Sequence, residues 1–504
     1  MSSTFKKALP FLFIYAFVLI LYYPVISTYF SHDDFFHFKV SLTDGSFKEF
    51  INFFGFHSFE ERNIAFYRPI FREVLYNSFH RIFGLNSLPF RILSFTIHFI
   101  NIFLIFKFMK MLFKNNYISY ISTFFFGVTA ANVAPFYYLA GGIQTQGATM
   151  FILTTLILFT RYLESKKSVF MKLSFMTFLL ALASHEQSAI LPILLAGLIL
   201  VNNKPKQLFK DILKLWPFFF TVLVYIFLNI KLIGYSSGEA QYRMVFNIKT
   251  TLQTLSWYIV WALGLPETFI DFLLPGFKLN PNLMKYWGNY YRIIFPSFAV
   301  ATIGIGLVFF YLVIKKGKML IDKKLWFLII WFPLGILPVI FLPSHKSTHY
   351  LYPSLPAFWG TAAFLIYNSY LQIRKFSVNF SKTLFALILI SLITLSSVSA
   401  TLGRTTYWAA ARGKVAEKLI KDVKTQYPVL PKGAAVYFKN DPSYPYLHED
   451  WGGTSKQASF ALNGEDGLQL LYNDPTLRVF YEDLGGLPQN FINEKTYTLT
   501  AHIR

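Results

Sequence analysis

Long apolar runs alternate with short polar connections along most of the chain, a pattern that predicts an α-helical polytopic membrane protein. The first run follows Lys6 and Lys7 and is close to the length of about 20 residues that a bilayer core requires. We interpret it as a retained span rather than a signal peptide, because it is long and no small-residue cleavage site follows. Eleven spans are predicted, at residues 8–26, 90–113, 117–134, 144–162, 173–184, 188–201, 215–233, 293–314, 325–342, 351–371 and 383–402.

The lysine clusters set the orientation of these spans. Residues 252–274 are apolar enough to suggest a further span, but that span would move the lysine cluster at 315–324 to the outer face, against the positive-inside rule. We therefore interpret residues 234–292 as an outer segment with an interfacial helix around 257–265, broken by Pro266, Pro275 and Pro281. The N-terminus is then cytoplasmic and the C-terminal part lies outside. Pro135 with Gly141 and Gly142 is expected to form the turn after the third span.

Two long segments lie outside the membrane in this topology. Residues 27–89 form a first outer loop, expected to carry amphipathic helices on the membrane surface. Residues 403–504 have the composition of a soluble domain, with a predicted helix at 414–427 and a predicted strand at 434–439. We expect a transmembrane module at residues 1–402 and a small extracytoplasmic α/β domain at residues 403–504.

Composition agrees with a membrane protein and excludes several other classes. Hydrophobic residues make up 54% of the 504 residues and charged residues only 14%, and the mean hydropathy is +0.44. The formal charge of +22 falls in short clusters between apolar runs, so topology explains it better than nucleic-acid binding. Cysteine is absent, which excludes disulfides and thiolate metal sites.

Three polar clusters interrupt the apolar pattern and are assigned to the same outer face. They are Asp33-Asp34, His185-Glu186-Gln187, and the stretch 345–352. A shared outer cavity is the simplest interpretation. Taken alone, an acid pair is more often a solvated loop or a helix N-cap, and His185 and Glu186 are as readily a polar tie between two helix ends.

The order of several motifs resembles one family of membrane enzymes. After the acid pair come Tyr67-Arg68-Pro69-Ile70, then the motif Phe-Thr-Ile-His-Phe-Ile-Asn at 95–101, then Ser184-His185-Glu186, and finally His-Tyr-Leu-Tyr-Pro-Ser-Leu-Pro at 349–356. Over about residues 1–400 this order resembles the GT-C class of membrane glycosyltransferases, in particular its protein O-mannosyltransferase-like branch. His185 and His349 stand where basic residues are usual in that branch, so their charge is expected to depend on pH.

The resemblance implies an inverting hexosyl- or pentosyltransferase that moves a sugar from a polyprenyl-phosphate donor to a hydroxyl of a protein or glycolipid acceptor, with a GT-C-like fold. Asp33, or failing it Asp34, would be the catalytic base. The leaving phosphate needs fixed donors, and the candidates are Arg68, Arg72, His185, Lys346 and His349. The remaining polar residues, with a substrate-binding or structural role, are Glu186, Gln187, His345, Tyr350 and Tyr352. The expected location is a bacterial inner or plasma membrane, with the site outside the cytoplasm.

Other functions remain open from the sequence. A flippase or transporter for a lipid-linked sugar or an anionic solute is one, although it would favour polar groups near mid-membrane and repeated halves. An O-antigen ligase-like transferase with a diphosphate donor is another. No nucleotide fingerprint is present and the sequence identifies no cofactor, but a divalent metal is an open alternative, for which the ligand candidates are His32 and His37, or His345 and His349.

Overall fold

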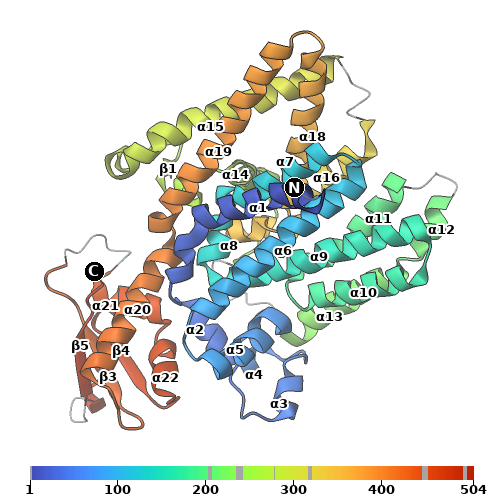
Figure 1. Cartoon of the computed structure of the whole chain (residues 1–504). Helices are drawn as coiled ribbons and strands as arrows, with labels where there is room; N and C mark the ends of the chain where they lie inside the picture. The colour runs from blue at the N-terminus through green and yellow to red at the C-terminus, as the bar shows by residue number, and fades with distance from the viewer. Residues whose placement is uncertain are drawn as a thin grey trace.

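The computed structural model describes residues 3–202, 207–233, 242–276, 278–315, 321–444, 452–491 and 496–503. Within these residues the protein is mostly helical, with long helices gathered in one part and a small sheet at one end (Figure 1). Six helices are long and apolar enough to cross a membrane, and a seventh is counted if a bent pair is taken as one span. The chain is therefore an integral membrane protein in its helical part, and the total of eleven spans stays a prediction.

Each predicted apolar run coincides with a helix or with a pair of consecutive helices. The N-terminal run forms α1 (Ser3–Tyr22) and η1 (Tyr23–Ser27). The next runs form α6 (Leu88–Phe113), α7 (Asn116–Val128), η3 (Ala130–Asn132), α8 (Val133–Tyr137), α9 (Leu139–Ser165), α10 (Ser168–Leu182), η4 (Glu186–Ile190), α11 (Leu191–Asn202), α12 (Leu208–Leu213), α13 (Trp216–Leu228) and η6 (Asn229–Ile233). The distal runs form α15 (Pro281–Lys315), α16 (Lys323–Gly335), α17 (Leu337–Ile340), η10 (Thr348–Leu351), α18 (Leu355–Arg374) and α19 (Val378–Thr406).

Two local predictions on these helices are wrong. Gly141 and Gly142 lie inside α9 rather than in a turn, and before them α7 and the η3–α8 segment are bent by 45° relative to each other. A Cβ on Gly142 would lie 1.9 Å from the carbonyl oxygen of Pro135, so glycine here permits close contact between α8 and α9. Pro281 does not break a helix but begins α15, because proline is tolerated in the first helical turn.

The predicted outer segment is only partly helical before α15. Its described part forms α14 (Ile248–Leu263), η8 (Glu267–Phe272) and the two-residue strands β1 (Leu273–Leu274) and β2 (Lys278–Leu279). The helix expected around 257–265 is thus present and ends at Gly264, whose φ of +113° suits glycine. Residues 234–241 of the predicted outer segment lie outside the described residues.

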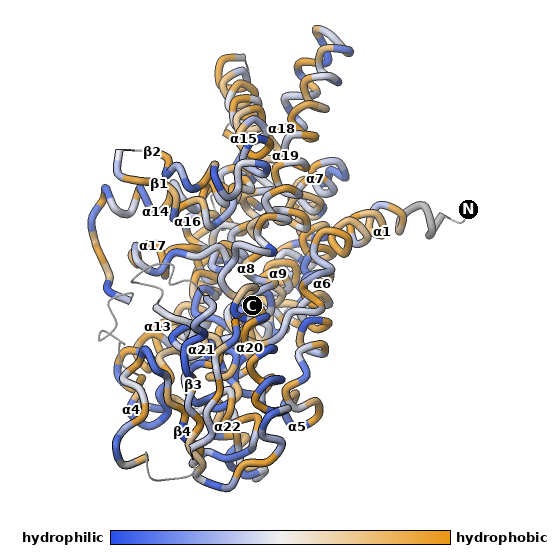
Figure 2. Tube along the Cα trace, turned by 90° about the vertical axis from the view of Figure 1, so that its left-hand side faces the viewer, coloured by the Kyte–Doolittle hydropathy of each residue, from blue (hydrophilic) through white to orange (hydrophobic). Residues whose placement is uncertain are grey.

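The first loop carries the short helices that its pattern predicts. They are α2 (Asp33–Val40), α3 (Phe47–Asn52), α4 (Phe59–Arg62), the π-helical turn η2 (Pro69–Val74) and α5 (Leu75–Phe83). Local sequence sets some of their ends: Ser58 and Glu61 form a capping box at the start of α4, and Asn63 ends it with φ of +53°. These helices lie at the end of the molecule that also carries the sheet (Figures 1 and 2).

The C-terminal part is a small α/β unit. It contains α20 (Trp408–Gln426), β3 (Ala435–Lys439), α21 (Thr454–Leu462), α22 (Asp466–Tyr472), β4 (Arg478–Tyr481), η11 (Glu482–Leu484), η12 (Gln489–Phe491) and β5 (Thr496–Thr500). The three strands form a parallel sheet in the order β4-β3-β5, with Val436 paired with Val479 and with Tyr497. The predicted helix and strand are therefore confirmed.

This α/β unit shares its apolar core with the first loop. One buried cluster contains Phe35 and Phe38 of α2 together with Leu419 of α20, Val436 of β3 and Leu468 of α22. A separate and larger cluster lies between the long helices. Figure 2 shows the same division: hydrophobic residues dominate α1, α15 and α19, whereas hydrophilic residues gather around α4, α22 and β4. The acid pair thus lies where the first loop meets the C-terminal unit.

Candidate functional site

Asp34 is a structural acid of the first loop. Its side chain is fully buried, and its two oxygens accept hydrogen bonds from the backbone N–H of Ser31 and the hydroxyl of Tyr76, each at 3.0 Å. Burial raises the pKa of Asp34 to about 6, against the lowering effect of nearby Arg91 and of these two donors. The carboxyl therefore ties the start of α2 to α5 and is closed to substrate.

Asp33 is the accessible acid of the pair. Its side chain is 36% exposed, and its Oδ2 accepts a hydrogen bond from the hydroxyl of Tyr138. Its Oδ1 lies 3.4 Å from Nε2 of His32. An exposed carboxylate held from one side can meet a substrate hydroxyl, whereas Asp34 cannot.

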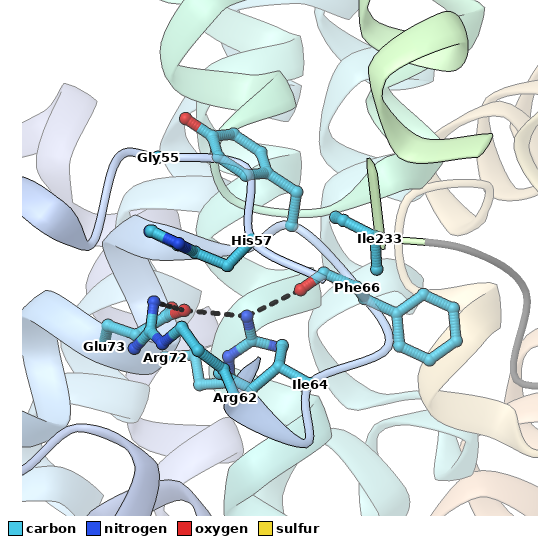
Figure 3. Close-up of a pocket in the computed structure, with 9 residues that line it drawn as sticks. Gly55, His57, Arg62, Ile64, Phe66, Arg72, Glu73 and Ile233 are labelled. Atoms are coloured by element: carbon cyan, nitrogen blue, oxygen red, sulfur yellow. Dashed lines mark hydrogen bonds and ion pairs between the residues drawn. The ribbon is translucent and has the colours of Figure 1, made fainter. Parts of the chain in front are cut away.

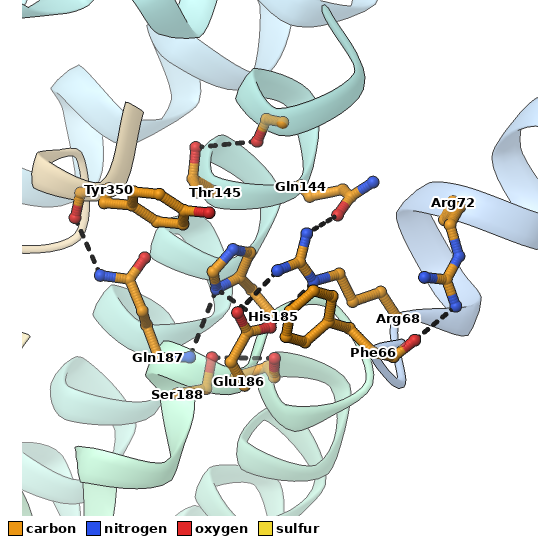
Figure 4. A network of polar contacts seen from close by, with 12 residues as sticks. Phe66, Arg68, Arg72, Gln144, Thr145, His185, Glu186, Gln187, Ser188 and Tyr350 are labelled. Atoms are coloured by element: carbon orange, nitrogen blue, oxygen red, sulfur yellow. Dashed lines mark hydrogen bonds and ion pairs between the residues drawn. The ribbon is translucent and has the colours of Figure 1, made fainter. Parts of the chain in front are cut away.

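The second cluster is built around a bidentate ion pair. The Nε and Nη2 atoms of Arg68 lie 2.8 and 2.6 Å from the two oxygens of Glu186, and Nη1 donates to Oε1 of Gln144 at 2.7 Å (Figure 4). Burial alone would raise the pKa of Glu186, but the Arg68 guanidinium lowers it to about 2. Burial would likewise lower the pKa of Arg68, and Glu186 more than reverses this. Both groups are charged across the physiological pH range.

Burial acts against a positive charge on His185 and His349, in contrast to the pH-dependent charge expected from the sequence. Burial lowers the pKa of His185 to about 3, with Arg68 as the second cause. Burial, followed by His345 and His185, lowers the pKa of His349 well below its ordinary value. Nδ1 of His185 accepts from the backbone N–H of Gln187 at 3.3 Å, so the ring hydrogen belongs on Nε2. That buried Nε2 has no hydrogen-bond partner among the described residues.

The three polar clusters meet around the start of α9. Nε2 of Gln187 donates to the backbone carbonyl of Tyr350 at 2.8 Å, which joins the second cluster to the third. The ring of Tyr138 lies 5.2 Å from that of His349 while its hydroxyl binds Asp33, which joins the third cluster to the acid pair. Tyr138 immediately precedes α9, and Gly141 and Gln144 follow it at spacings of three residues. Sequence reasoning missed Tyr138 and Gln144, although this spacing around the glycine pair could have revealed them.

Two of the proposed phosphate donors point elsewhere. Nη2 of Arg72 donates to the carbonyl of Phe66 at 2.6 Å and to Glu73 at 2.8 Å, in a pocket that His57 and Arg62 also line (Figure 3). Nζ of Lys346 donates to the carbonyl of Pro343 in its own loop. The phosphate-binding roles expected for Arg72 and Lys346 stay predictions.

The tyrosines of the third cluster divide between the site and the helix bundle. The hydroxyl of Tyr350 lies 2.9 Å from Nε2 of His345, next to the Arg68 cluster. The hydroxyl of Tyr352 instead lies 2.7 Å from Nδ1 of His98 and 3.3 Å from Nδ2 of Asn101, inside the bundle. Tyr352 thus holds helices together rather than lining the site.

His32 and His37, one pair of metal candidates, have different partners. Nδ1 of His32 lies 2.9 Å from the carbonyl of Phe460, whereas the ring of His37 is buried with Nδ1 3.5 Å from the amide of Gln144. Within the part of the chain that the structure describes, no group of three or more His, Asp and Glu residues could hold a metal ion.

Comparison with known proteins yields distant structural matches. No family model and no curated protein match the chain. The apo oligosaccharyltransferase of Archaeoglobus fulgidus has 12% identity and a TM-score of 0.48, with 95% of this chain and 65% of that chain covered. The same organism's oligosaccharyltransferase AglB, in complex with an inhibitory peptide and a dolichol-phosphate, has 11% identity and a TM-score of 0.45, with 87% and 63% covered.

A second enzyme matches over more of its own length. ArnT from Cupriavidus metallidurans bound to undecaprenyl phosphate has 11% identity and a TM-score of 0.40, with 95% of this chain and 86% of that chain covered. These structural neighbours are GT-C glycosyltransferases, the class that the motifs resemble. The chain spans less than two-thirds of the oligosaccharyltransferase, and TM-scores below 0.5 carry no argument about activity. The function is therefore argued from the site.

Proposed function

We propose that the protein is an inverting membrane glycosyltransferase, which moves a sugar from a polyprenyl-phosphate donor to the hydroxyl of a protein or glycolipid acceptor at the outer membrane face. One observation carries this proposal. The exposed carboxylate of Asp33 meets, through Tyr138, a buried cluster that contains the Arg68 cation and the N–H of His185, which has no hydrogen-bond partner among the described residues. A proton acceptor and an anion-stabilising group lie on either side of one tyrosine.

Asp33 supplies the base that an acceptor hydroxyl needs. A neutral hydroxyl is a poor nucleophile, so a positioned carboxylate that takes its proton during attack lowers the barrier. Tyr138 holds Oδ2, which leaves Oδ1 for the substrate proton. A single displacement at the anomeric carbon inverts its configuration.

The Arg68 cluster has the second task, which is to stabilise the negative charge on the leaving phosphate. A buried donor left unpaired costs about 1–3 kcal/mol, so the free Nε2–H of His185 is a ready partner for an oxygen that becomes more negative as the bond breaks. Arg68 adds a full positive charge, although Glu186 offsets part of it. His349 lies beside this cluster, and its Nδ1 is 3.0 Å from the hydroxyl of Ser347.

The proposal includes the finer topology: eleven spans, a cytoplasmic N-terminus, a transmembrane module at residues 1–402 and an outer α/β domain at residues 403–504. Because the chain has no cysteine, single cysteines can be labelled in intact cells without background. An impermeant maleimide should label cysteines placed at Ser46 and Ser443, and should not label those at Ser165 and Ser377. All four positions are exposed, so labelling of Ser377 with protection of Ser443 would contradict this topology.

The activity itself is tested with defined donors. Purified protein in detergent is incubated with radiolabelled mannose, glucose, galactose or arabinose on polyprenyl phosphate, and in parallel with the corresponding polyprenyl diphosphates. Transfer or hydrolysis from a phosphate donor supports the proposal. Turnover of diphosphate donors alone would favour the ligase-like alternative. Translocation of intact donor in vesicles without turnover would favour a carrier.

A further inference from the structure

The C-terminal unit holds the residue that precedes the proposed base. The backbone N–H of His32 donates to the carbonyl of Ala461 at 2.9 Å, at the end of α21. His32 has φ of +47°, which is uncommon for a residue other than glycine and persists only where surrounding contacts hold it. Nearby, Nζ of Lys39 on α2 lies 2.6 Å from Asp466 of α22. The conformation beside Asp33 therefore depends on the last hundred residues of the chain.

These contacts also fix the tautomer of His32. Its Nδ1 lies 2.9 Å from the carbonyl oxygen of Phe460, and a carbonyl only accepts hydrogen bonds. Nδ1 must therefore carry the hydrogen, and in the neutral ring Nε2 is left with its lone pair. That Nε2 lies 3.4 Å from Oδ1 of Asp33, the oxygen that Tyr138 leaves free. The Nε2 atom of His32 thus faces the Asp33 carboxylate across a short gap.

We propose that His32 receives the proton that Asp33 takes from the acceptor, with the C-terminal unit fixing the imidazole in the tautomer that can accept it. The inference rests on the proposed function. In the first step the acceptor oxygen bonds to the anomeric carbon, its proton goes to Asp33, and the carbon–oxygen bond to phosphate breaks with its electron pair on the phosphate oxygen. In the second step the proton passes from Oδ1 to Nε2, which restores the Asp33 carboxylate and leaves an imidazolium.

The surroundings favour onward release of that proton to water. The side chain of His32 is 30% exposed and that of Asp33 36% exposed, so both reach solvent. Arg412 of α20 lies over the rings of Trp408, at 4.9 Å, and Phe460, at 5.2 Å. Burial lowers the pKa of Arg412, and the Asp33 carboxylate opposes this. Asp34, the other adjacent acid, is turned away toward Tyr76.

The test compares His32 with a second histidine of the same loop. His57 also has one ring nitrogen 2.9 Å from a backbone carbonyl and the other 3.5 Å from a carboxylate, but it lies outside the proposed site. Single-turnover rates are measured across pH with the labelled polyprenyl-phosphate sugars described above. His32→Gln should lower the rate about 10²-fold with donor binding retained, and should change the acid limb of the pH profile, whereas His57→Gln should leave both unchanged.

Chemical rescue separates proton transfer from a structural role. His32→Ala should regain rate in added imidazole, in proportion to the unprotonated fraction of the imidazole. A wild-type rate and pH profile in His32→Gln would overturn the inference, as would a loss in His32→Ala that imidazole does not rescue. Asp33→Asn separates a failure of Asp33 as the base from a failure of the role proposed for His32. Full transfer in Asp33→Asn would remove the proposed base itself, whereas loss in Asp33→Asn with normal His32→Gln would remove only the role of His32.

Discussion

The two halves of the proposed site differ in their exposure and in what holds them. Asp33 and His32 are 36% and 30% exposed, and α21 of the C-terminal unit fixes their loop. Arg68 is only 10% exposed and His185 is fully buried, and the start of α9 and the η4 turn hold them. One half, the open half, is partly exposed and anchored by the C-terminal unit, whereas the other, the dry half, is buried and anchored by the helix bundle.

This difference matches what each half would have to do. A base that gives up its proton after every turnover needs a path to water. Groups that stabilise a developing phosphate charge act more strongly where water is excluded, because the local dielectric is low and no solvent has to reorganise. The comparison therefore predicts that changes in the open half act on proton transfer, and that changes in the dry half act on donor binding.

The largest expected effect is on the open half. Asp33→Asn keeps the size of the side chain and removes the carboxylate, so transfer should fall by about 10²–10⁴-fold while donor binding is retained. Single-turnover assays and donor-binding titration measure the two quantities. Asp44→Asn, at an exposed acid of the same loop, is the control. Full activity in the double variant Asp33→Asn, Asp34→Asn would eliminate the base and with it this mechanism.

Asp34 should affect stability rather than turnover. Its folded-state pKa of about 6 lies above the ordinary value of 3.8, so its contribution to stability is fully present below about pH 4 and is lost as pH rises through 6. The shift corresponds to about 3 kcal/mol in the free energy of unfolding. Denaturation in detergent at pH 4.5 and 7.5 should show this loss in the wild type and a smaller one in Asp34→Asn. Equal pH dependence in both proteins would contradict the assignment.

Arg68 tests the dry half. Arg68→Ala should weaken donor binding or turnover by about 1.5–3 kcal/mol, as expected for a lost charge-assisted contact. The single change also leaves the Glu186 carboxylate unpaired, so Arg68→Ala with Glu186→Gln is the matched variant. If the double variant binds donor as the wild type does, Arg68 only neutralises Glu186 and has no part in phosphate binding.

The smallest expected effect on donor binding is that of His185→Ala. Its pH dependence distinguishes a neutral donor from a cationic one. Because burial lowers its pKa to about 3, the ring stays neutral at both pH 6 and pH 8. His185→Ala should therefore weaken donor binding by about 0.5–1.5 kcal/mol, equally at the two pH values. Binding that weakens with rising pH in the wild type but not in His185→Ala would show that the histidine binds as a cation after all.

Much of the secondary structure was predictable because it depends on local sequence. The eleven apolar runs all coincide with helices, and the strand at 435–439 and the helix at 408–426 appear where alternation and helical spacing indicate them. The wrong predictions concern residues whose role depends on their position in the helix and on neighbouring helices. Proline and glycine at 281 and at 141–142 were interpreted as breaks, whereas a helix start and a close contact between two helices explain them. Residue type alone does not distinguish these roles.

The candidate site was predictable only as a set of residue types. Sequence order placed Asp33, Arg68, His185 and His349 in one candidate site, and the structure brings these four close together. It could not separate Arg68 from Arg72, because the π-helical turn directs one guanidinium toward Glu186 and the other toward Glu73. It also could not show that Tyr138 connects the clusters.

The sequence by itself determined which segments are apolar helices and which residues carry charge, because hydrophobic length and ionisable groups are properties of the chain taken locally. Only the tertiary structure decided the states of those groups. Burial makes His185 neutral and sets Asp34 apart from Asp33, and both effects come from neighbours far away in the chain. The contact of Phe460 and Ala461 with His32 joins residues more than 400 positions apart, and it requires the C-terminal unit to share an apolar core with the first loop.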